Sequence, residues 1–169
     1  MKKLICILFI LTIILLNRNS NEENVIIPDK SIRFRIIANS NSEYDQEIKL
    51  KIKNDIQEKI FSTLKTNNYD NTENSIKKNE KLLDEVLKKY NINYNISYGE
   101  NYFPEKVYKG VIYPEGEYQS LVVTLGEGIG DNWWCVLFPP LCLLEANENE
   151  YTDVEYSLYT KEIINKFMN

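Results

Sequence analysis

The segment from Asp131 to Cys142 holds both tryptophans and two of the three cysteines of this 169-residue chain. Trp133 and Trp134 are adjacent, and neighbouring side chains on a strand point to opposite faces of the sheet. The segment therefore predicts one ring in the core and one facing outward, in an order that alternation does not decide. An outward Trp favours a binding surface, because Trp is frequent among interface hot spots. The alternative is that both rings cover the end of a small core.

Two cysteines close this segment. Cys135 and Cys142 flank Pro139-Pro140, and they are the only cysteines left if the N-terminal segment that contains Cys6 is removed. An isolated cysteine pair in an exported domain is expected to oxidise. The Cys-x6-Cys spacing differs from the Cys-x-x-Cys of redox-active thiol pairs. We predict a structural disulfide, with two free thiols as the alternative.

The first residues have the pattern of an export signal. Lys2 and Lys3 precede thirteen uncharged, mostly apolar residues from Leu4 to Leu16, as in a secretory signal. This run is shorter than the roughly 20 residues that span a bilayer. No Ala-x-Ala cleavage site follows it, so cleavage and retention as a membrane anchor both stay open. We expect a signal or anchor segment with a tether over residues 1–24 and a single exported domain over residues 25–169.

Helical and strand periods alternate along that domain. Ile32, Phe34 and Ile36 alternate with arginines, which predicts a half-buried strand. Ser40-x-x-Glu43 has the pattern of a capping box. The helix expected after it places one apolar stripe on a face, formed by Ile48, Ile52, Ile56, Ile60 and Leu64. After an Asn-rich turn over residues 66–71, a second helix capped near Asn71 or Thr72 carries Ile76, Leu83, Val86, Leu87 and Tyr90 on one face.

The period then changes to two. Strands are predicted over 94–98, 107–113, 121–125 and 134–138, with the last two paired across the Gly-rich loop, and a final strand over 154–158 precedes a short helix ending near Phe167. The predicted fold class is therefore α+β. Two amphipathic helices follow a first strand and pack on a mostly antiparallel sheet of about five strands, with a short C-terminal helix.

Composition excludes several chemistries. The chain has no histidine, which excludes Ser-His and Cys-His nucleophile pairs and His-bound zinc. Gly126–Gly130 contains a glutamate and lacks the Lys-Ser/Thr ending of a phosphate loop, so it predicts a hairpin loop. Glu115, Glu117 and Asp131 are candidates for carboxylate catalysis or solvated surface acids. We predict no catalytic residue, no metal site and no cofactor.

The charge pattern bears on partners. The net charge is −5 and no basic stripe is present, so we predict no nucleic-acid binding. Arg33 and Arg35 share one face of the first strand. They either solvate that face or pair with helix acids, or they dock an acidic partner surface, for which the guanidinium fork is suited.

Two blocks of the sequence carry a family resemblance. The first is Ile32–Ser42, followed by Asp45-Gln46 and Lys49–Lys51; the second comprises Phe103–Tyr108, Pro114–Tyr118, Leu125–Gly130 and Asn132–Cys142. Both blocks resemble the stage II sporulation protein R family, exported signalling proteins of endospore-forming bacteria. The resemblance covers roughly residues 31 to 142.

The resemblance implies a signalling function. Such proteins are made in the forespore and exported into the space between the forespore and mother cell membranes. There they trigger a membrane-embedded aspartic protease, which processes the inactive precursor of a mother-cell sigma factor. By this resemblance the chain is an activator and not an enzyme, and it touches the membrane through its N-terminal segment if that segment is uncleaved.

A candidate partner-binding set follows. It joins the two arginines to residues of the Trp-rich segment, whose exposed ring is undecided: Arg33, Arg35, Asp131, Asn132, Trp133, Trp134 and Phe138. Two other functions are the alternatives. One is a secreted cell-wall hydrolase that uses paired carboxylates. The other is a membrane-tethered structural protein of the septum.

Overall fold

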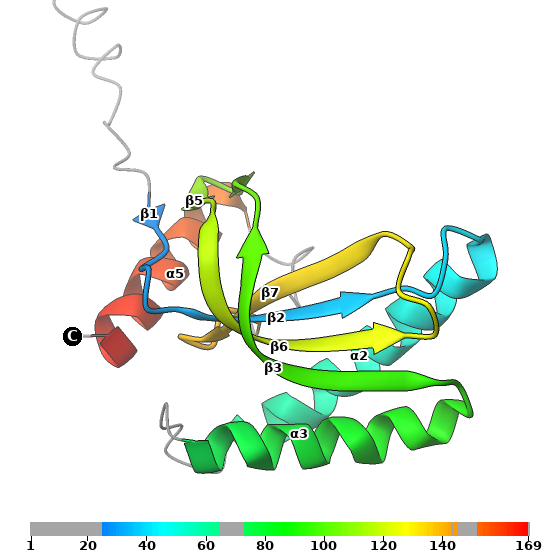
Figure 1. The fold of residues 1–169 in the computed structure, drawn as a ribbon. Helices are drawn as coiled ribbons and strands as arrows, with labels where there is room; N and C mark the ends of the chain where they lie inside the picture. Colours follow the sequence, from blue (N-terminus) through cyan, green and yellow to red (C-terminus); the bar gives the residue numbers. More distant parts are fainter. Residues whose placement is uncertain (1–24, 65–72, 143, 145–151, 169) are drawn as a thin grey trace, which may run out of the picture.

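Helices and strands separate into layers in the computed structural model, which describes residues 25–64, 73–142, 144 and 152–168 (Figure 1). The strands are β1 (Val25–Ile26), β2 (Ile32–Ile37), β3 (Tyr94–Phe103), β4 (Lys106–Tyr108), β5 (Val111–Tyr113), β6 (Gly116–Leu125) and β7 (Asn132–Phe138). The helices are α2 (Glu43–Leu64), α3 (Glu73–Leu87), the 3-10 turn η1 (Lys88–Tyr90) and α5 (Asp153–Met168). The expected export segment and the turn over residues 66–71 lie outside the described residues.

The strands form two mixed sheets. The larger has the order β3-β6-β2-β7, in which β2 runs parallel to β6 and the other two pairings are antiparallel. The smaller has the order β1-β5-β4, with β1 parallel to β5. The α+β class is confirmed, with the strands divided between two sheets where one was expected. No helix in the described part of the chain is long and apolar enough to cross a membrane.

The predicted pairing of β7 is wrong. We expected this strand to pair with β6 across the Gly-rich loop, but β7 pairs with β2, from Ile32 opposite Phe138 to Ile37 opposite Asn132. Because β2 lies between β6 and β7, the Gly-rich loop is not a hairpin. It crosses the end of β2 to reach the far side of that strand.

Two further elements differ from the sequence prediction. The strand expected over residues 107–113 is two short strands, β4 and β5, separated by Lys109 and Gly110 at positive φ. The strand expected over residues 154–158 belongs to α5. The spacing of the buried Tyr156 and Thr160 is that of one helix face, and this spacing outweighs the short apolar alternation.

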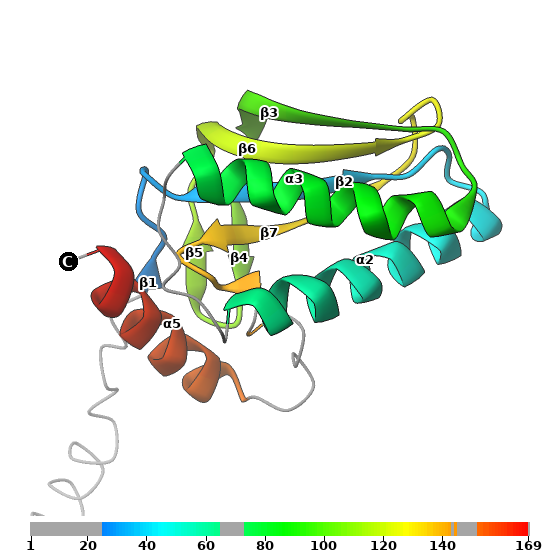
Figure 2. The same ribbon diagram turned by 90° about the horizontal axis from the view of Figure 1, so that it is seen from below.

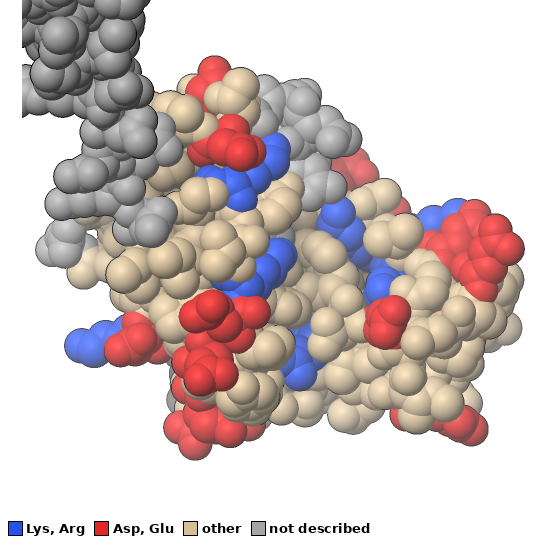
Figure 3. Space-filling view, turned by 90° about the horizontal axis from the view of Figure 1, so that it is seen from above, with Lys and Arg blue, Asp and Glu red and all other residues tan. Residues whose placement is uncertain are grey.

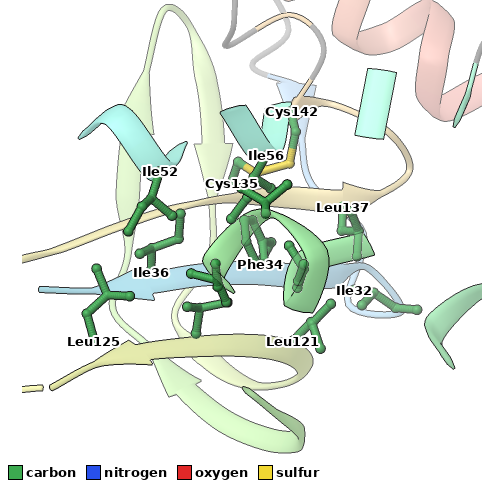
Figure 4. Packing of buried hydrophobic residues seen from close by; sticks show 14 of the residues in the cluster. Ile32, Phe34, Ile36, Ile52, Ile56, Leu121, Leu125, Cys135, Leu137 and Cys142 are labelled. Atoms are coloured by element: carbon green, nitrogen blue, oxygen red, sulfur yellow. A yellow bond between two sulfur atoms is a disulfide. The ribbon is translucent and has the colours of Figure 1, made fainter. Parts of the chain in front are cut away.

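The main core lies between the larger sheet and two helices. Figure 2 shows α2 and α3 side by side over one face of the sheet. In Figure 4, Ile52 and Ile56 of α2 point toward Phe34 and Ile36 of β2. All four are essentially inaccessible to solvent, which confirms the central part of the apolar stripe predicted for α2. The side chains of residues 60 and 64 are outside the described set.

A second, aromatic core lies on the other face of the larger sheet, at one end. It joins β1, β3, β5, β6, β7 and α5 through a buried cluster that includes Phe103, Tyr113, Trp134 and Tyr156. The Tyr113 and Tyr156 hydroxyls form a buried hydrogen bond of 2.8 Å. Through this cluster the smaller sheet and α5 pack on one end of the larger sheet, where Figure 1 shows them together.

β1 is packed into the aromatic core and paired with β5. Val25 and Ile27 are buried in the aromatic core, and Ile27 N donates to Ile112 O. A chain that begins at Ser31 therefore loses two buried side chains and the β1–β5 pairing. We expect the free energy of unfolding of such a chain to be lower by at least about 3 kcal/mol than that of a chain that begins at Asn24, since burying each side chain contributes about 1.5–3 kcal/mol. Urea unfolding of both chains measures the difference, and equal midpoints would show that β1 contributes nothing.

The structure joins Cys135 and Cys142 in a disulfide, as predicted. Both residues are buried in the main core, and Gln57 of α2 donates to the Cys142 carbonyl. Reduction of the exported protein should lower the free energy of unfolding by about 2.5 kcal/mol, because the bridge limits the unfolded chain. Denaturant unfolding with and without reductant measures this effect. Intact mass should show two hydrogens fewer than the reduced form, and two freely alkylatable thiols would contradict the bridge.

Candidate functional site

Two connections meet at one edge of the larger sheet. Because β2 and β6 are parallel, their carboxyl ends, Ile37 and Leu125, lie at the same edge. From there Ala38–Ser42 leads into α2 and Gly126–Asp131 leads into β7. We call these two connections the loop hub. Crevices at the carboxyl ends of parallel strands are frequent ligand sites in α/β sheets, which makes the hub the first place to look for a function.

Ser42 begins α2. Its Oγ accepts a hydrogen bond from Asp45 N and its carbonyl accepts one from Gln46 N, which is the geometry of an N-cap. The capping box predicted at Ser40 and Glu43 is therefore displaced by two residues. Ser40 instead donates its hydroxyl to the Asp45 carboxylate at 2.6 Å.

Asn39 links the two connections of the hub. Its Nδ2 donates to Asp45 Oδ2 at 2.9 Å, and its Oδ1 accepts from Glu127 N at 2.9 Å. The hydrogen bonds from Ser40 and Asn39 lower the pKa of the Asp45 carboxyl. Asp45 is therefore ionised at neutral pH, and it stays so in mildly acidic solution.

A second link involves Asp131, a predicted binding residue. Asn41 Oδ1 accepts from Asp131 N at 2.6 Å, and Lys49 Nζ donates to Asp131 O at 2.9 Å and to Gln46 Oε1 at 2.5 Å. Lys49 is buried, and this burial lowers the pKa of its ammonium group, an effect that nearby Asp131 opposes. The Lys49 ammonium group thus makes its hydrogen bonds within the fold, whereas Asp131 is exposed to solvent.

Two glycines allow the connections to touch. Gly126 has φ +55°, and a Cβ there would lie 2.1 Å from Asn39 Oδ1. A Cβ on Gly130 would lie 2.3 Å from the backbone oxygen of Ser40, which cannot rotate away. The Gly-rich segment is therefore required for close approach between two chain segments.

A pocket of about 230 Å³ opens beside the hub. Its lining combines the apolar side chains of Ile48, Ile92 and Leu125 with Asn39, Tyr44, Asp45, Asn93 and Gly126. Tyr44 is 67% exposed and Ile129, at the tip of the Gly-rich loop, is 72% exposed. The hub thus combines an apolar pocket, two exposed apolar side chains and an ionised carboxylate on two connections joined by hydrogen bonds.

The predicted arginine surface is wrong for Arg33. The Arg33 side chain is fully buried, with Cζ 3.5 Å from the Tyr118 ring centroid and Nη2 donating to Pro114 O at 2.9 Å. It neither solvates the strand nor pairs with a helix acid. Arg35 is half-buried and donates to Tyr102 O at 2.7 Å. Burial lowers the pKa of Arg33 to about 10 and also lowers the pKa of Arg35.

The Trp-rich segment is divided between the two cores. Trp134 is 8% exposed and packs edge-to-face on Phe103 and Tyr113. Trp133, on the opposite face, is half-buried beside Phe34 and beneath Lys53. Alternation on the strand is therefore confirmed, but neither ring is fully outward.

The predicted partner-binding residues differ in their exposure to solvent. Arg33, Trp134 and Phe138 are buried and offer a partner no surface in this structure. Asp131 and Asn132 are exposed, while Trp133 and Arg35 are half-buried. For these four, partner binding stays a prediction.

Sequence reasoning named Asp131 and missed the other residues that build the hub. Asn39 and Asp45 entered only through the blocks of the family resemblance, and Ile129 only within the predicted hairpin loop. The signal available was the run of short polar residues after the first strand, which is typical of side-chain capping. Nothing local to that run indicates that it meets a loop nearly ninety residues later.

Comparison with known proteins identifies one family whose matching region includes both connections of the hub. A family described as "Stage II sporulation protein R (spore_II_R)" matches residues 28–148. The chain belongs to this family. It is 36% identical over 140 residues to stage II sporulation protein R of Bacillus subtilis (strain 168), covering 79% of this chain and 62% of that protein. The chain therefore spans less than two thirds of the length of this relative. No solved structure matches the chain.

Proposed function

We propose that this chain is an exported sporulation signalling protein, made in the forespore, that activates a membrane-embedded aspartic protease. The activated protease then processes the precursor of a mother-cell sigma factor. The observation that carries this proposal is membership of the stage II sporulation protein R family over residues 28–148. The basic and apolar pattern of residues 1–16 supports export.

The proposed place of action is the space between the forespore and mother cell membranes. A buried disulfide suits an exported domain, because thiols in the cytoplasm are kept reduced. The hub offers a preformed surface, which reduces the ordering cost of binding a partner. In this proposal the chain contributes binding, and catalysis belongs to the protease.

Activation by binding has a thermodynamic requirement. The chain must bind the active state of the protease more tightly than the inactive state, or it shifts no population. A dimeric protease is the natural active state, since an aspartic-protease site uses two carboxylates that share a proton. A hundredfold activation needs about 2.7 kcal/mol of differential binding.

Co-expression tests the proposal directly. The full chain, the protease and the sigma precursor are expressed together in a bacterium that does not sporulate, and processing is followed by immunoblot. We expect processed sigma factor only when all three are present and the chain carries residues 1–24. Processing without the chain, or none with all three folded and present, would overturn the proposal. A purified chain that cleaves cell wall by itself would favour the hydrolase.

A further inference from the structure

The hub carries a surface that is partly exposed to solvent. We call the hub face the surface formed by Tyr44 and Asp45, which line the 230 Å³ pocket, together with Glu127, Ile129 and Asp131 of the Gly-rich connection. Ile129 N donates to Asn39 O, and Gly130 N donates to Ala38 O. The backbone of the Gly-rich loop is thus held in place while the Ile129 side chain projects into solvent. An aliphatic side chain that stays exposed contributes no burial to the stability of the fold.

The pocket of the hub face has the size of a side-chain site. Its volume is below the range of about 300–1,000 Å³ typical of small-molecule sites. Its apolar lining, from Ile48, Ile92 and Leu125, suits one aliphatic or aromatic side chain. The pocket can therefore receive one side chain of a partner. The exposed Ile129 side chain can in turn pack against the partner's surface.

The charge of the hub face selects the partner. Glu127 and Asp131 supply exposed carboxylates and Asp45 a half-buried one that already accepts from Asn39 and Ser40, whereas the hub's lysine, Lys49, is buried and donates to Asp131 O and Gln46. Figure 3 shows acidic side chains at the right-hand end of the molecule, the end where Figure 1 places the hub, with basic side chains beside them and further acidic side chains at the lower left. A second copy of this chain, with its net charge of −5, would meet like charge.

We infer that the hub face is the docking site for an extracytoplasmic segment of the protease that carries an aliphatic or aromatic side chain next to Lys or Arg. The apolar side chain enters the pocket and contacts Tyr44, while the cation lies against the carboxylates of Asp45 and Glu127. Ile129 packs on the partner beside this contact. The inference rests on the proposed function, since it names the surface by which that activation occurs.

Two hub variants and two matched controls test the inference. Ile129→Ser removes the exposed aliphatic tip, and Glu127→Lys reverses one charge. Leu158→Ser and Glu162→Lys make the same changes on α5, where Leu158 is 62% exposed and Glu162 is also exposed. Figure 1 shows α5 at the opposite end of the molecule from the hub. All four side chains are exposed, so we expect melting temperatures close to that of the unchanged chain.

The readouts are affinity for the detergent-solubilised protease and sigma-precursor processing in co-expressing cells. We expect Ile129→Ser and Glu127→Lys each to weaken binding tenfold or more and to lower processing in parallel, whereas both α5 variants match the unchanged chain. Higher salt should weaken binding of the unchanged chain more than that of Glu127→Lys, because a screened charge contact is lost.

Each failure has a distinct result. If the unchanged chain produces no processing, the proposed function fails before the surface is tested. If it does, but the hub variants equal the α5 controls in affinity and processing, the docking surface lies elsewhere and the inference is overturned. A hub variant that changes the oligomeric state of the chain, seen by light scattering, without changing affinity for the protease would assign the face to self-association and also overturn it.

Discussion

Trp134→Ala is expected to lower the free energy of unfolding by about 3–5 kcal/mol, the loss typical of truncating a buried aromatic side chain. The Trp134 ring lies 5.3 Å from Phe103 and 5.5 Å from Tyr113 between centroids, in edge-to-face geometry. The Lys106 ammonium and the Arg33 guanidinium lie within 5.0 Å of its centroid. Truncation therefore leaves a cavity at the junction of the two sheets, where several partners lose contact together.

Trp133→Ala is the matched control on the same strand. Its ring is half-buried and has Phe34 as an edge-to-face neighbour at 6.1 Å, so we expect a smaller loss of about 1–2 kcal/mol. Urea unfolding followed by circular dichroism avoids dependence on tryptophan fluorescence. Equal losses for both variants would show that the two faces of β7 contribute equally, contrary to the burial of Trp134.

Local periodicity was enough to predict the helices on the main core. Ile52 and Ile56 are four residues apart and both are buried, because α2 presents one face to the sheet. The same argument failed for α5. Val154, Tyr156 and Leu158 alternate over too short a run to separate a strand from a helix, and the burial of Tyr156 depends on the distant Tyr113.

Long-range pairing was not predictable from the sequence. Strands adjacent in sequence are usually neighbours in a sheet, and this tendency led to the wrong partner for β7. The hub depends on the true arrangement, because only a loop that crosses the end of β2 brings Asp131 to Asn41. Composition indicated loops at both places, but the contact between them is a property of the topology.

Arg33→Ala should cost about 2–4 kcal/mol of stability, because it opens a cavity among aromatic rings. The guanidinium carbon of Arg33 lies within 5.0 Å of the Tyr118, Phe103 and Trp134 centroids. Truncation also leaves the Pro114 carbonyl without the donor that Arg33 Nη2 provides. We expect this loss to have the same cause as that of Trp134→Ala, since both variants leave a cavity in the same aromatic core.

Arg33→Met separates the volume of this side chain from its charge. Arg33 Nε and Nη1 are buried and have no hydrogen-bond partner, so the charged head is incompletely compensated. Burial lowers the pKa of Arg33 to about 10, and the folded and unfolded states therefore both carry the charge at neutral pH. The cost of burying it is present there and would be relieved only as the pH rises past 10, where the folded state releases its proton first.

A methionine of similar length fills the space without that cost. Replacing a buried charge by an apolar side chain of similar volume is often neutral or stabilising. We therefore expect the free energy of unfolding of Arg33→Met to lie within about 1 kcal/mol of that of the unchanged protein. Urea unfolding at pH 7 of Arg33→Ala, Arg33→Met and the unchanged chain provides the comparison. If Arg33→Met loses as much stability as Arg33→Ala, the cation over the Tyr118 ring and the hydrogen bond to Pro114 stabilise this core, and side-chain volume alone does not.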